Sequence, residues 1–258
     1  MTGKQDTARA ANERLPKTQA AVTAEGSALA RYQDVVLGKR SWLSLAYFEF
    51  CMWLTWIPGA LGLVLRQVFW RRLFGACGKK VYFGANVVLM HPDRIRIGDR
   101  TVISNGCVLD ARNPGLNEVI TLGDDVVLSH GVMISCKNGR VSIGDRVGIG
   151  AYTVIQSASD NAVAIEDDVI LAAQCYVTGG GNYNTDRLDI PIARQGMRAT
   201  EGTRIEEGAW LGVRATVVGG VTVGKHGIVG AGAVVNRSLP EMTVSVGVPA
   251  RTVRKRGE

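Results

Sequence analysis

Aromatic residues are scarce in this sequence, at 6% of 258 positions, whereas glycine occurs 32 times. Such a chain has few bulky rings with which to build thick helical layers, and it favours many tight turns joined by short strands. Histidine occurs three times at distant positions, so the sequence offers no clustered ligand set and we assign no metal.

The cysteine pattern gives no sign of a disulfide framework. The five cysteines are an odd number and form no C-x-x-C pair, which is typical of reduced thiols in a cytosolic compartment. The net charge of +7 would suit nucleic acid, an anionic membrane or a phosphorylated ligand. We expect no nucleic acid, because basic and aromatic residues do not interleave as they do in nucleic-acid modules.

The front of the chain separates into a polar part and an apolar part. Residues 1–30 have no sustained apolar period, and we expect a disordered lead-in there. Residues 42–65 carry Glu49 as their single formal charge and are long enough to cross a bilayer as one helix. This run begins too deep in the chain for an ordinary signal peptide.

Two features of the apolar run argue against a simple crossing. Pro58 and Gly59 lie inside it and should break a helix, and basic residues flank both of its ends. Because positive charge favours the cytoplasmic side, both ends should stay on that side. Residues 31–75 are therefore predicted to form a helical hairpin that associates with the cytoplasmic face of the inner membrane. The alternative is a helical cap packed on the soluble domain or on a neighbouring subunit.

A six-residue repeat fills the rest of the chain and decides the fold. Each hexad starts with an aliphatic residue and has a small or β-branched residue at its fifth place, a spacing that does not fit the helix period of about 3.6. The first places are Ile97, Ile103, Leu109, Leu122, Leu128, Ile134, Ile143, Ile149, Ile155, Ile165, Leu171, Val177, Ile205, Leu211, Val217, Val223, Val229 and Val235. The fifth places include Thr101, Cys107, Val126, Val132, Val147, Thr153, Val169, Cys175, Ala209, Ala215, Val221 and Ala233.

The repeat is interrupted at regular points. Hexads come in threes, and the first places on either side of the four interruptions lie 13, 9, 10 and 28 residues apart. Because three hexads complete one triangular coil, all four insertions should leave from the same corner. We expect six or seven coils, stacked at the strand spacing of ~4.8 Å, with the apolar first places forming one continuous interior.

The hexads resemble those of the left-handed β-helix acyltransferases over about residues 75–256. The likeness is strongest in Gly208–Gly224, in Gly230–Pro240 and in Val246–Arg251. Within that family the chain is most similar to the O-acetyltransferases of bacterial exopolysaccharide clusters, the colanic-acid type. Those often carry a hydrophobic segment before the β-helix and a Gly-Gly-Gly loop like residues 179–181. The resemblance implies an all-β, left-handed parallel β-helix.

The resemblance also implies a homotrimer that binds acetyl-CoA between subunits and transfers the acetyl group to a sugar hydroxyl. Trp210 and Gly212 match positions that line the pantetheine cleft in relatives. The family places basic residues near the CoA phosphates, and the candidates here are Arg237, Arg251 and Arg254.

The catalytic base is where the sequence departs from the family. The insertion at 178–204 is the expected lid over the acceptor site and holds Asn182, Tyr183 and Asp186. In many relatives a histidine base occupies the place of Tyr183. An unperturbed tyrosine titrates at about 10 and is a poor general base at neutral pH. Three readings stay open: a neighbour activates Tyr183, another histidine serves, or catalysis has been lost.

His130 is the histidine best placed to serve instead. It occupies an outward-facing third place of its hexad, two coils or ~10 Å along the axis from the coil that carries the long insertion. A neighbouring subunit of a trimer could close part of that distance. The alternative for His130 is an ordinary exposed histidine in a turn.

These observations divide the chain into a lead-in at 1–30, the hairpin at 31–75, the β-helix at 76–240 with its loop at 178–204, and a basic C-terminal segment at 241–258. The hairpin favours an acceptor held at the membrane, either a polysaccharide unit or its lipid-linked precursor. Two alternatives stay open. One is transfer to a small soluble acceptor, and the other is a catalytically silent scaffold, which the loss of the histidine would favour.

Overall fold

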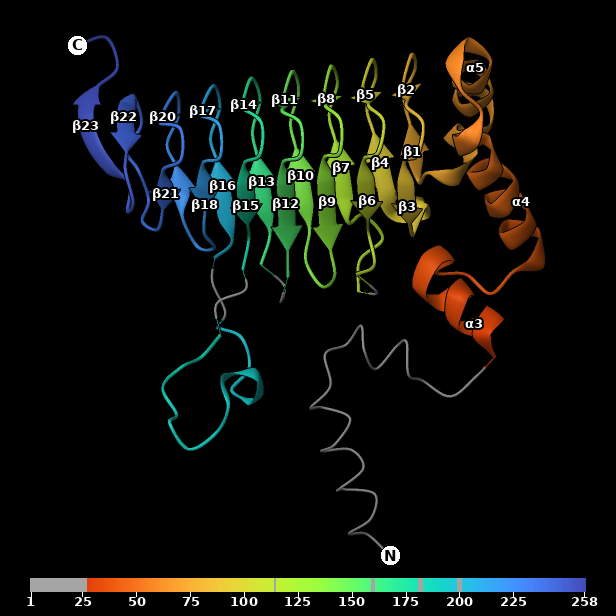
Figure 1. The fold of residues 1–258 in the computed structure, drawn as a ribbon, viewed down its shortest axis with the longest axis horizontal. Coiled ribbons are helices and arrows are strands. Elements are labelled where there is room, and N and C mark those ends of the chain that lie inside the picture. Colours follow the sequence, from red (N-terminus) through yellow and green to blue (C-terminus); the bar gives the residue numbers. More distant parts are fainter. Residues whose placement is uncertain (1–26, 114, 159–160, 181–182, 199–200) are drawn as a thin grey trace, which may run out of the picture.

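The protein is a solenoid of short strands with a helical cap at one end (Figure 1). This computed structural model describes residues 27–113, 115–158, 161–180, 183–198 and 201–258. Successive strands enter three different sheets in turn, so every third strand pairs with the next one in the same sheet. The three sheets form the walls of a triangular prism.

The walls take their strands in chain order. Wall 1 contains β1 (Ala76–Cys77), β4 (Ile95–Ile97), β7 (Ile120–Leu122), β10 (Val141–Ile143), β13 (Val163–Ile165), β16 (Thr203–Ile205) and β19 (Thr222–Val223). Wall 2 contains β2 (Tyr82–Phe83), β5 (Val102–Ile103), β8 (Val127–Leu128), β11 (Gly148–Ile149), β14 (Ile170–Leu171), β17 (Trp210–Leu211), β20 (Ile228–Val229), β22 (Thr243–Val246) and β23 (Arg251–Lys255). Wall 3 contains β3 (Val88–Met90), β6 (Val108–Asp110), β9 (Met133–Cys136), β12 (Val154–Ser157), β15 (Tyr176–Thr178), β18 (Thr216–Val217) and β21 (Val234–Val235).

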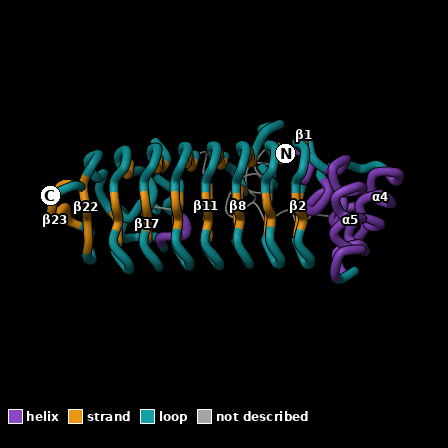
Figure 2. The backbone as a smooth tube through the Cα atoms, turned by 90° about the horizontal axis from the view of Figure 1, so that it is seen from above, coloured by secondary structure: helices purple, strands orange, loops and turns teal. Residues whose placement is uncertain are grey.

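The pairing confirms the predicted parallel β-helix. Neighbouring strands are parallel, except that β23 runs antiparallel to β22 at the C-terminal end of wall 2. Within the described residues, β1 to β21 complete seven coils, and Figure 2 shows them as evenly stacked turns of the chain.

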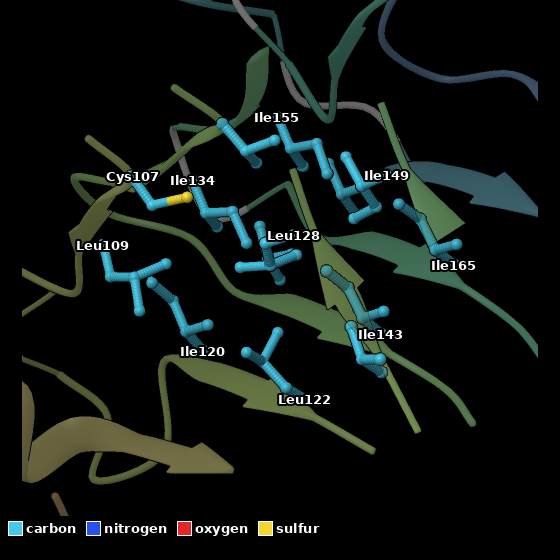
Figure 3. Packing of buried hydrophobic residues seen from close by; sticks show 14 of the residues in the cluster. Cys107, Leu109, Ile120, Leu122, Leu128, Ile134, Ile143, Ile149, Ile155 and Ile165 are labelled. Atoms are coloured by element: carbon cyan, nitrogen blue, oxygen red, sulfur yellow. The ribbon is translucent and has the colours of Figure 1, made fainter. Parts of the chain in front are cut away.

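The interior is built by the hexad residues that the sequence singled out. Every aliphatic first place is at most 4% exposed, and every fifth place named above is at most 6% exposed. Figure 3 shows part of this core, in which Leu128 and Ile134 from one coil and Ile149 from the next point inward together. Burying one such side chain stabilises the fold by roughly 1.5–3 kcal/mol, so each coil depends on its neighbours for its stability.

Acidic side chains hold the corner between walls 1 and 2. Asp124, Asp145 and Asp167 each accept a hydrogen bond, at 2.7 to 2.9 Å, from the backbone N–H of the acidic residue one coil earlier. Beside this ladder, the guanidinium of Arg100 forms two hydrogen bonds of 2.6 Å with the carboxylate of Asp125. The corner is therefore held by local polar contacts while the apolar residues fill the interior.

The insertions leave the solenoid where the hexad count predicted. They connect β6 to β7, β9 to β10, β12 to β13 and β15 to β16, which is always the passage from wall 3 to wall 1. In Figure 1 this corner lies along the lower side of the solenoid. The prediction of a single shared corner is confirmed.

Short helices cap the N-terminal end of the solenoid. They are α3 (Ala28–Tyr32), the π-helical turn η1 (Gln33–Leu37), α4 (Trp42–Trp53), the 3-10 turn η2 (Leu54–Trp56), α5 (Gly59–Phe69) and the 3-10 turn η3 (Trp70–Leu73). Two further 3-10 turns, η4 (Pro92–Arg94) and η5 (Ile192–Arg194), lie in loops. Pro58 precedes α5, so the predicted helix break at Pro58-Gly59 is confirmed. Among the residues that the structure describes, no helix combines the length and apolarity needed to cross a membrane.

The cap packs directly on the first coil. The ring of Phe83 in β2 lies 5.5 Å from that of Trp70 and 5.4 Å from that of Phe74, between ring centroids. The indole N–H of Trp70 also donates to the backbone oxygen of Cys51, at 2.8 Å, which ties α4 to the same cluster. The helices therefore pack as a cap on the β-helix, which is the alternative that the sequence left open. This packing does not decide whether the cap also contacts a membrane.

A buried arginine joins the cap to the coil. Arg66 is 3% exposed, and its guanidinium donates to the backbone oxygens of Phe83, Leu54 and Ile57, each at 2.9 Å. Burial lowers the pKa of Arg66, but a guanidinium stays charged in proteins. Gly62 leaves the space for this contact, because a Cβ atom there would lie 1.8 Å from the oxygen of Ile57.

Candidate functional site

The longest insertion forms a projecting arm, which we define as residues 179–202. Its two ends are joined at the wall, where the buried hydroxyl of Thr203 donates to the backbone oxygen of Thr178 at 2.7 Å. Figure 1 shows the arm extending away from the solenoid between β15 and β16. The arm thus leaves wall 3 and enters wall 1 at neighbouring points.

Glycines at the base let the arm leave between tightly stacked coils. A Cβ atom on Gly179 would lie 2.5 Å from the backbone oxygen of Asn161, and one on Gly180 would lie 2.4 Å from the side-chain nitrogen of Asn161. On the other side, a Cβ atom on Gly219 would lie 2.8 Å from the Cα atom of Gly180. These close contacts fix the point at which the arm emerges.

Gln195 braces the tip of the arm. Its side-chain oxygen accepts from the backbone N–H of Arg187 at 3.0 Å, and its side-chain nitrogen donates to the backbone oxygens of Arg187 and Ile190 at 2.6 and 3.2 Å. The side chain of Asn184 adds a hydrogen bond to the backbone oxygen of Gln195 at 3.1 Å. The described part of the arm is therefore held by hydrogen bonds of its own.

The predicted catalytic residues of the arm lie on its surface. Tyr183 is 45% exposed and pairs with Met197 across the base of the arm. Asp186 is exposed, and the neighbouring Arg187 forms its ion pair with Asp189 instead. Asn182 lies outside the described residues.

His130 lies at a different corner of the prism from the arm. It is an exposed residue of the turn between β8 and β9, which joins wall 2 to wall 3, whereas the arm joins wall 3 to wall 1. The backbone oxygen of His130 accepts from the N–H of Tyr152 at 2.9 Å. The structure therefore does not bring His130 together with Tyr183 and Asp186 within one chain.

Wall 2 brings most of the predicted donor-binding residues together. Trp210 is 48% exposed. It begins a column of paired residues across four neighbouring strands, which continues through Ile228 and Val244 to Arg254. Three strand spacings, roughly 14 Å, separate Trp210 from Arg254 along this column. Arg251 is exposed at the other end of the same strand, β23. The outer face of the wall thus changes from an apolar surface to a cationic end.

The other two donor candidates, Gly212 and Arg237, lie outside this column, and Gly212 is the nearer to Trp210. Gly212 follows Trp210 at the corner between walls 2 and 3, where a Cβ atom would lie 2.6 Å from the backbone nitrogen of Ala231. Its backbone N–H donates to the oxygen of Val229 at 2.8 Å, so the glycine is required by the stacking of the coils. Arg237 is exposed after β21 in wall 3, around the corner from Trp210.

A buried polar group beneath the insertion corner was not among the predicted site residues. Asp110 is 4% exposed and accepts two hydrogen bonds of 2.7 Å from the guanidinium of Arg112, and one of 3.1 Å from the hydroxyl of Ser135. Two coils after Asp110, the buried hydroxyl of Ser157 donates to the backbone oxygen of Asn161. The sequence signal was a polar residue directly after an aliphatic first place, at the strand end where an insertion begins.

The five cysteines are free thiols, four of them in the coils and Cys51 in helix α4 of the cap. Cys107 and Cys175 are buried at fifth places, and burial raises the pKa of the Cys107 thiol to about 11. A thiol with so high a pKa is a poor nucleophile at neutral pH. No trio of histidine, cysteine, aspartate or glutamate residues within the described part of the chain is arranged to hold a metal ion.

Known proteins share both the repeat and the fold. The family profile described as a hexapeptide repeat of succinyl-transferase matches residues 77–111, 140–179 and 202–237, which lie in the coils described above. The chain carries the hexapeptide repeat of the acyltransferases over these coils. It is 27% identical over 168 residues to a protein of Mycobacterium tuberculosis provisionally named as the acetyltransferase Rv3034c, covering 63% of this chain and 55% of that one.

A second relative of this hexapeptide-repeat protein is WbbJ of Escherichia coli K12, provisionally named as a lipopolysaccharide biosynthesis O-acetyltransferase. The two are 34% identical over 122 residues, covering 45% of this chain and 61% of WbbJ. The chain thus spans a little over half the length of these two curated relatives. Among solved structures, a mutant of AntD, an N-acyltransferase from Bacillus cereus, has the same fold with a TM-score of 0.50 at 22% identity, covering 71% of this chain and 85% of AntD.

Proposed function

We propose that this protein is an acetyl-CoA-dependent O-acetyltransferase that modifies a sugar hydroxyl of a bacterial polysaccharide or of its lipid-linked precursor. The observation that carries the proposal is the outer column of wall 2, where the exposed Trp210 leads to the guanidinium groups of β23. An apolar strip that ends in exposed arginines matches a ligand with an uncharged chain and a phosphorylated end, as CoA has. AntD, which shares the fold, was solved with dTDP and CoA bound.

The acceptor side of the proposal rests on the arm and on the relatives. An exposed arm that is braced internally can cover an extended substrate while the coils beneath it stay rigid. WbbJ is named for lipopolysaccharide biosynthesis, and its substrate class supports a saccharide here. Attack by a sugar hydroxyl on the thioester needs a base to remove its proton and donors that stabilise the resulting oxyanion.

A homotrimer is part of the proposal, and the outer faces of the walls support it. Wall 2 exposes an apolar column, and so does wall 3, whereas the matching column of wall 1 is mainly polar. The exposed members are Tyr82, Val127, Ile170 and Trp210 on wall 2 and Val88, Met133 and Tyr176 on wall 3. We therefore expect the corner between walls 2 and 3, which carries His130, to face neighbouring subunits. The arm of a neighbour could then approach His130, which the arm of the same chain does not.

Calorimetric titration with acetyl-CoA tests the donor side. We expect Arg254→Ala to weaken binding by about tenfold, since a charge-assisted contact to phosphate contributes roughly 1.5 kcal/mol. Arg96→Ala is the matched control, because Arg96 is another exposed arginine on a strand, but on wall 1, and it should bind like the wild type. The absence of any acetyl-CoA binding by the wild type would favour the silent scaffold.

Thiol release from acetyl-CoA, measured with a crude extract of lipid-linked saccharide, tests the chemistry. If His130 is the base, His130→Ala abolishes release while acetyl-CoA binding is retained. If Tyr183 is the base, Tyr183→Phe does so instead. Release that depends on neither residue would contradict the assignment of both. Equal release with small soluble sugars would contradict the polymeric acceptor.

A further inference from the structure

The helical cap has two apolar faces, and the packing against the solenoid uses one of them. The inner face of α4 is formed by Leu45, Phe48 and Cys51, which are at most 7% exposed. The outer residues of the cap are 45% to 85% exposed and comprise Trp42, Leu43, Phe50, Trp53, Trp56, Leu61, Val64 and Val68. We call this set the outer face of the cap.

The spacing of these residues makes the outer face continuous along both helices. In α4, Leu43, Phe50 and Trp53 follow one another at intervals of seven and three residues, which places them on one side of a helix. In α5, Leu61, Val64 and Val68 have intervals of three and four residues. A helix on the surface of a soluble domain normally turns a polar stripe outward, so three exposed tryptophans among aliphatic residues call for a covering partner.

A cleft opens between the end of α4 and the start of α5. Its volume is about 610 Å³, and it is lined by Glu49, Phe50, Trp53, Leu54, Trp56, Ile57 and Pro58. Glu49 is the one charged residue of this lining, and its carboxylate accepts a hydrogen bond from the hydroxyl of Tyr32. The cleft is large enough and apolar enough to admit an alkyl chain.

The charge of the molecule is concentrated around this face. Residues 27–80 contain eight basic and two acidic residues, whereas residues 81–258 contain eighteen of each sign. Arg40 is paired with Asp34 and Lys39 with Asp93, and Arg66 is buried, so the other basic residues of this segment carry its excess charge. Arg71 and Arg72 are exposed just after α5, and neither forms an ion pair within the described part of the chain. A partner that covers the outer face thus meets the part of the chain that carries the excess of positive charge.

We propose that the outer face of the cap docks on the surface of a bilayer that contains anionic lipid, with α4 and α5 lying in the plane of the interface. Exposed tryptophans suit the interfacial layer, and aliphatic residues between them reach the acyl chains. Basic residues at both ends of the helical segment attract the anionic headgroups. A second copy of the chain fits less well, because two such caps would bring two positive surfaces together.

Docking through the cap fixes the solenoid as well as the helices. The buried hydrogen bonds of Arg66 and the stacking of Trp70 on Phe83 leave no flexible linker between the outer face and the first coil. Because the cap lies at one end of the solenoid (Figure 1), we infer that the solenoid axis rises from the membrane instead of lying along it. The cytoplasmic leaflet, which carries anionic lipid, is the surface that this charge distribution matches.

Co-sedimentation of the full-length chain with vesicles tests the proposal without donor or acceptor. We expect binding to phosphatidylcholine vesicles that contain phosphatidylglycerol, and about tenfold weaker binding when phosphatidylglycerol is left out. The double variant Trp53→Glu with Trp56→Glu should lose about tenfold or more, because both side chains are over 75% exposed and their loss leaves the core intact. Arg71→Glu with Arg72→Glu should lose a similar factor in low salt.

The matched control places two glutamates at the opposite end of the solenoid. Val248 and Val253 are 72% and 59% exposed, and Val248→Glu with Val253→Glu adds the same charge as the tryptophan variant. It should bind vesicles like the wild type. Equal binding by the tryptophan variant and the wild type would overturn the proposal. So would a wild type that ignores vesicles but doubles in mass in solution, with the doubling lost in the tryptophan variant, since a second copy would then be the occupant.

Discussion

Arg66 shows how a single charged side chain can be buried when its surroundings are complete. Three backbone oxygens surround the guanidinium, and one of them belongs to the first coil, so the residue joins two parts of the fold. Gly62 is a necessary part of the arrangement, because any side chain there would push against the oxygen of Ile57 and against Arg66.

Gly62→Ala should therefore destabilise the protein by about 2–4 kcal/mol, through overpacking and the loss of a buried hydrogen bond. The measurement is urea denaturation followed by tryptophan fluorescence, which reports on Trp70 in the affected cluster. Gly148→Ala is the matched control, because a Cβ atom on Gly148 meets nothing within 4 Å. Equal stability of the two variants would show that the cap tolerates a methyl group at Gly62 and that the cradle of Arg66 is not tight.

At the scale of elements, the conformation of the arm depends on a small set of hydrogen bonds made by Gln195. Gln195→Ala removes three hydrogen bonds that hold the tip, each contributing about 0.5–1.5 kcal/mol. We expect the arm to be cut faster by protease, by about tenfold or more, while the melting temperature of the coils is unchanged, since the arm packs little on the solenoid. Gln174→Ala, which removes one hydrogen bond to Arg214 in a turn, is the control and should keep the arm intact. Unchanged cleavage in Gln195→Ala would mean that another contact orders the tip.

The elements of the solenoid were predictable because the hexad repeat sets the wall, the coil and the inward direction of each aliphatic residue at once. Even the common corner of the insertions followed from counting hexads. The cap was harder, because α4 is apolar on both sides, and a helix with no polar face gives no signal of which side is buried. The side of α4 that is buried is determined by its packing near Trp70 and Phe83, which lie far from α4 in the sequence.

Sequence motifs named donor candidates, but they did not show which of these residues share a wall. Trp210 and the arginines of β23 were named from motifs, and the hairpin of β22 and β23 places Arg251 and Arg254 on the same wall as Trp210. Arg237 was grouped with them, yet it lies beyond wall 3. The separation of His130 from the arm could have been found by the same counting, because His130 lies in the second hexad of its coil and the arm follows the third hexad of its own coil. Counting hexads in one chain does not show which residues of a neighbouring subunit lie close to His130.

At the scale of the whole molecule, the apolar columns of walls 2 and 3 give a direct test of assembly. Ile170 is 56% exposed on wall 2, and Ala164 occupies the equivalent outward place on wall 1 of the same coil. Ile170→Glu should convert the proposed trimer to monomers, because a carboxylate buried at an interface without a partner costs several kcal/mol. Ala164→Glu should leave the trimer intact. Light scattering during size-exclusion chromatography measures both masses, and a wild type that elutes as a monomer would contradict the trimer.

The position of the arm along the solenoid fixes its distance from the cap. The arm leaves after β15, and four strand spacings along wall 3 separate β15 from β3 in the first coil, which is ~19 Å. If the cap rests on a bilayer, a hydroxyl group must stand at least that far above the headgroups to reach the arm. A sugar attached directly to its lipid would stay below this level, whereas the outer residues of an assembled saccharide would reach it. The number of coils between the cap and the arm can be counted from the hexads of the sequence. That number would then decide which sugar along a growing chain is modified.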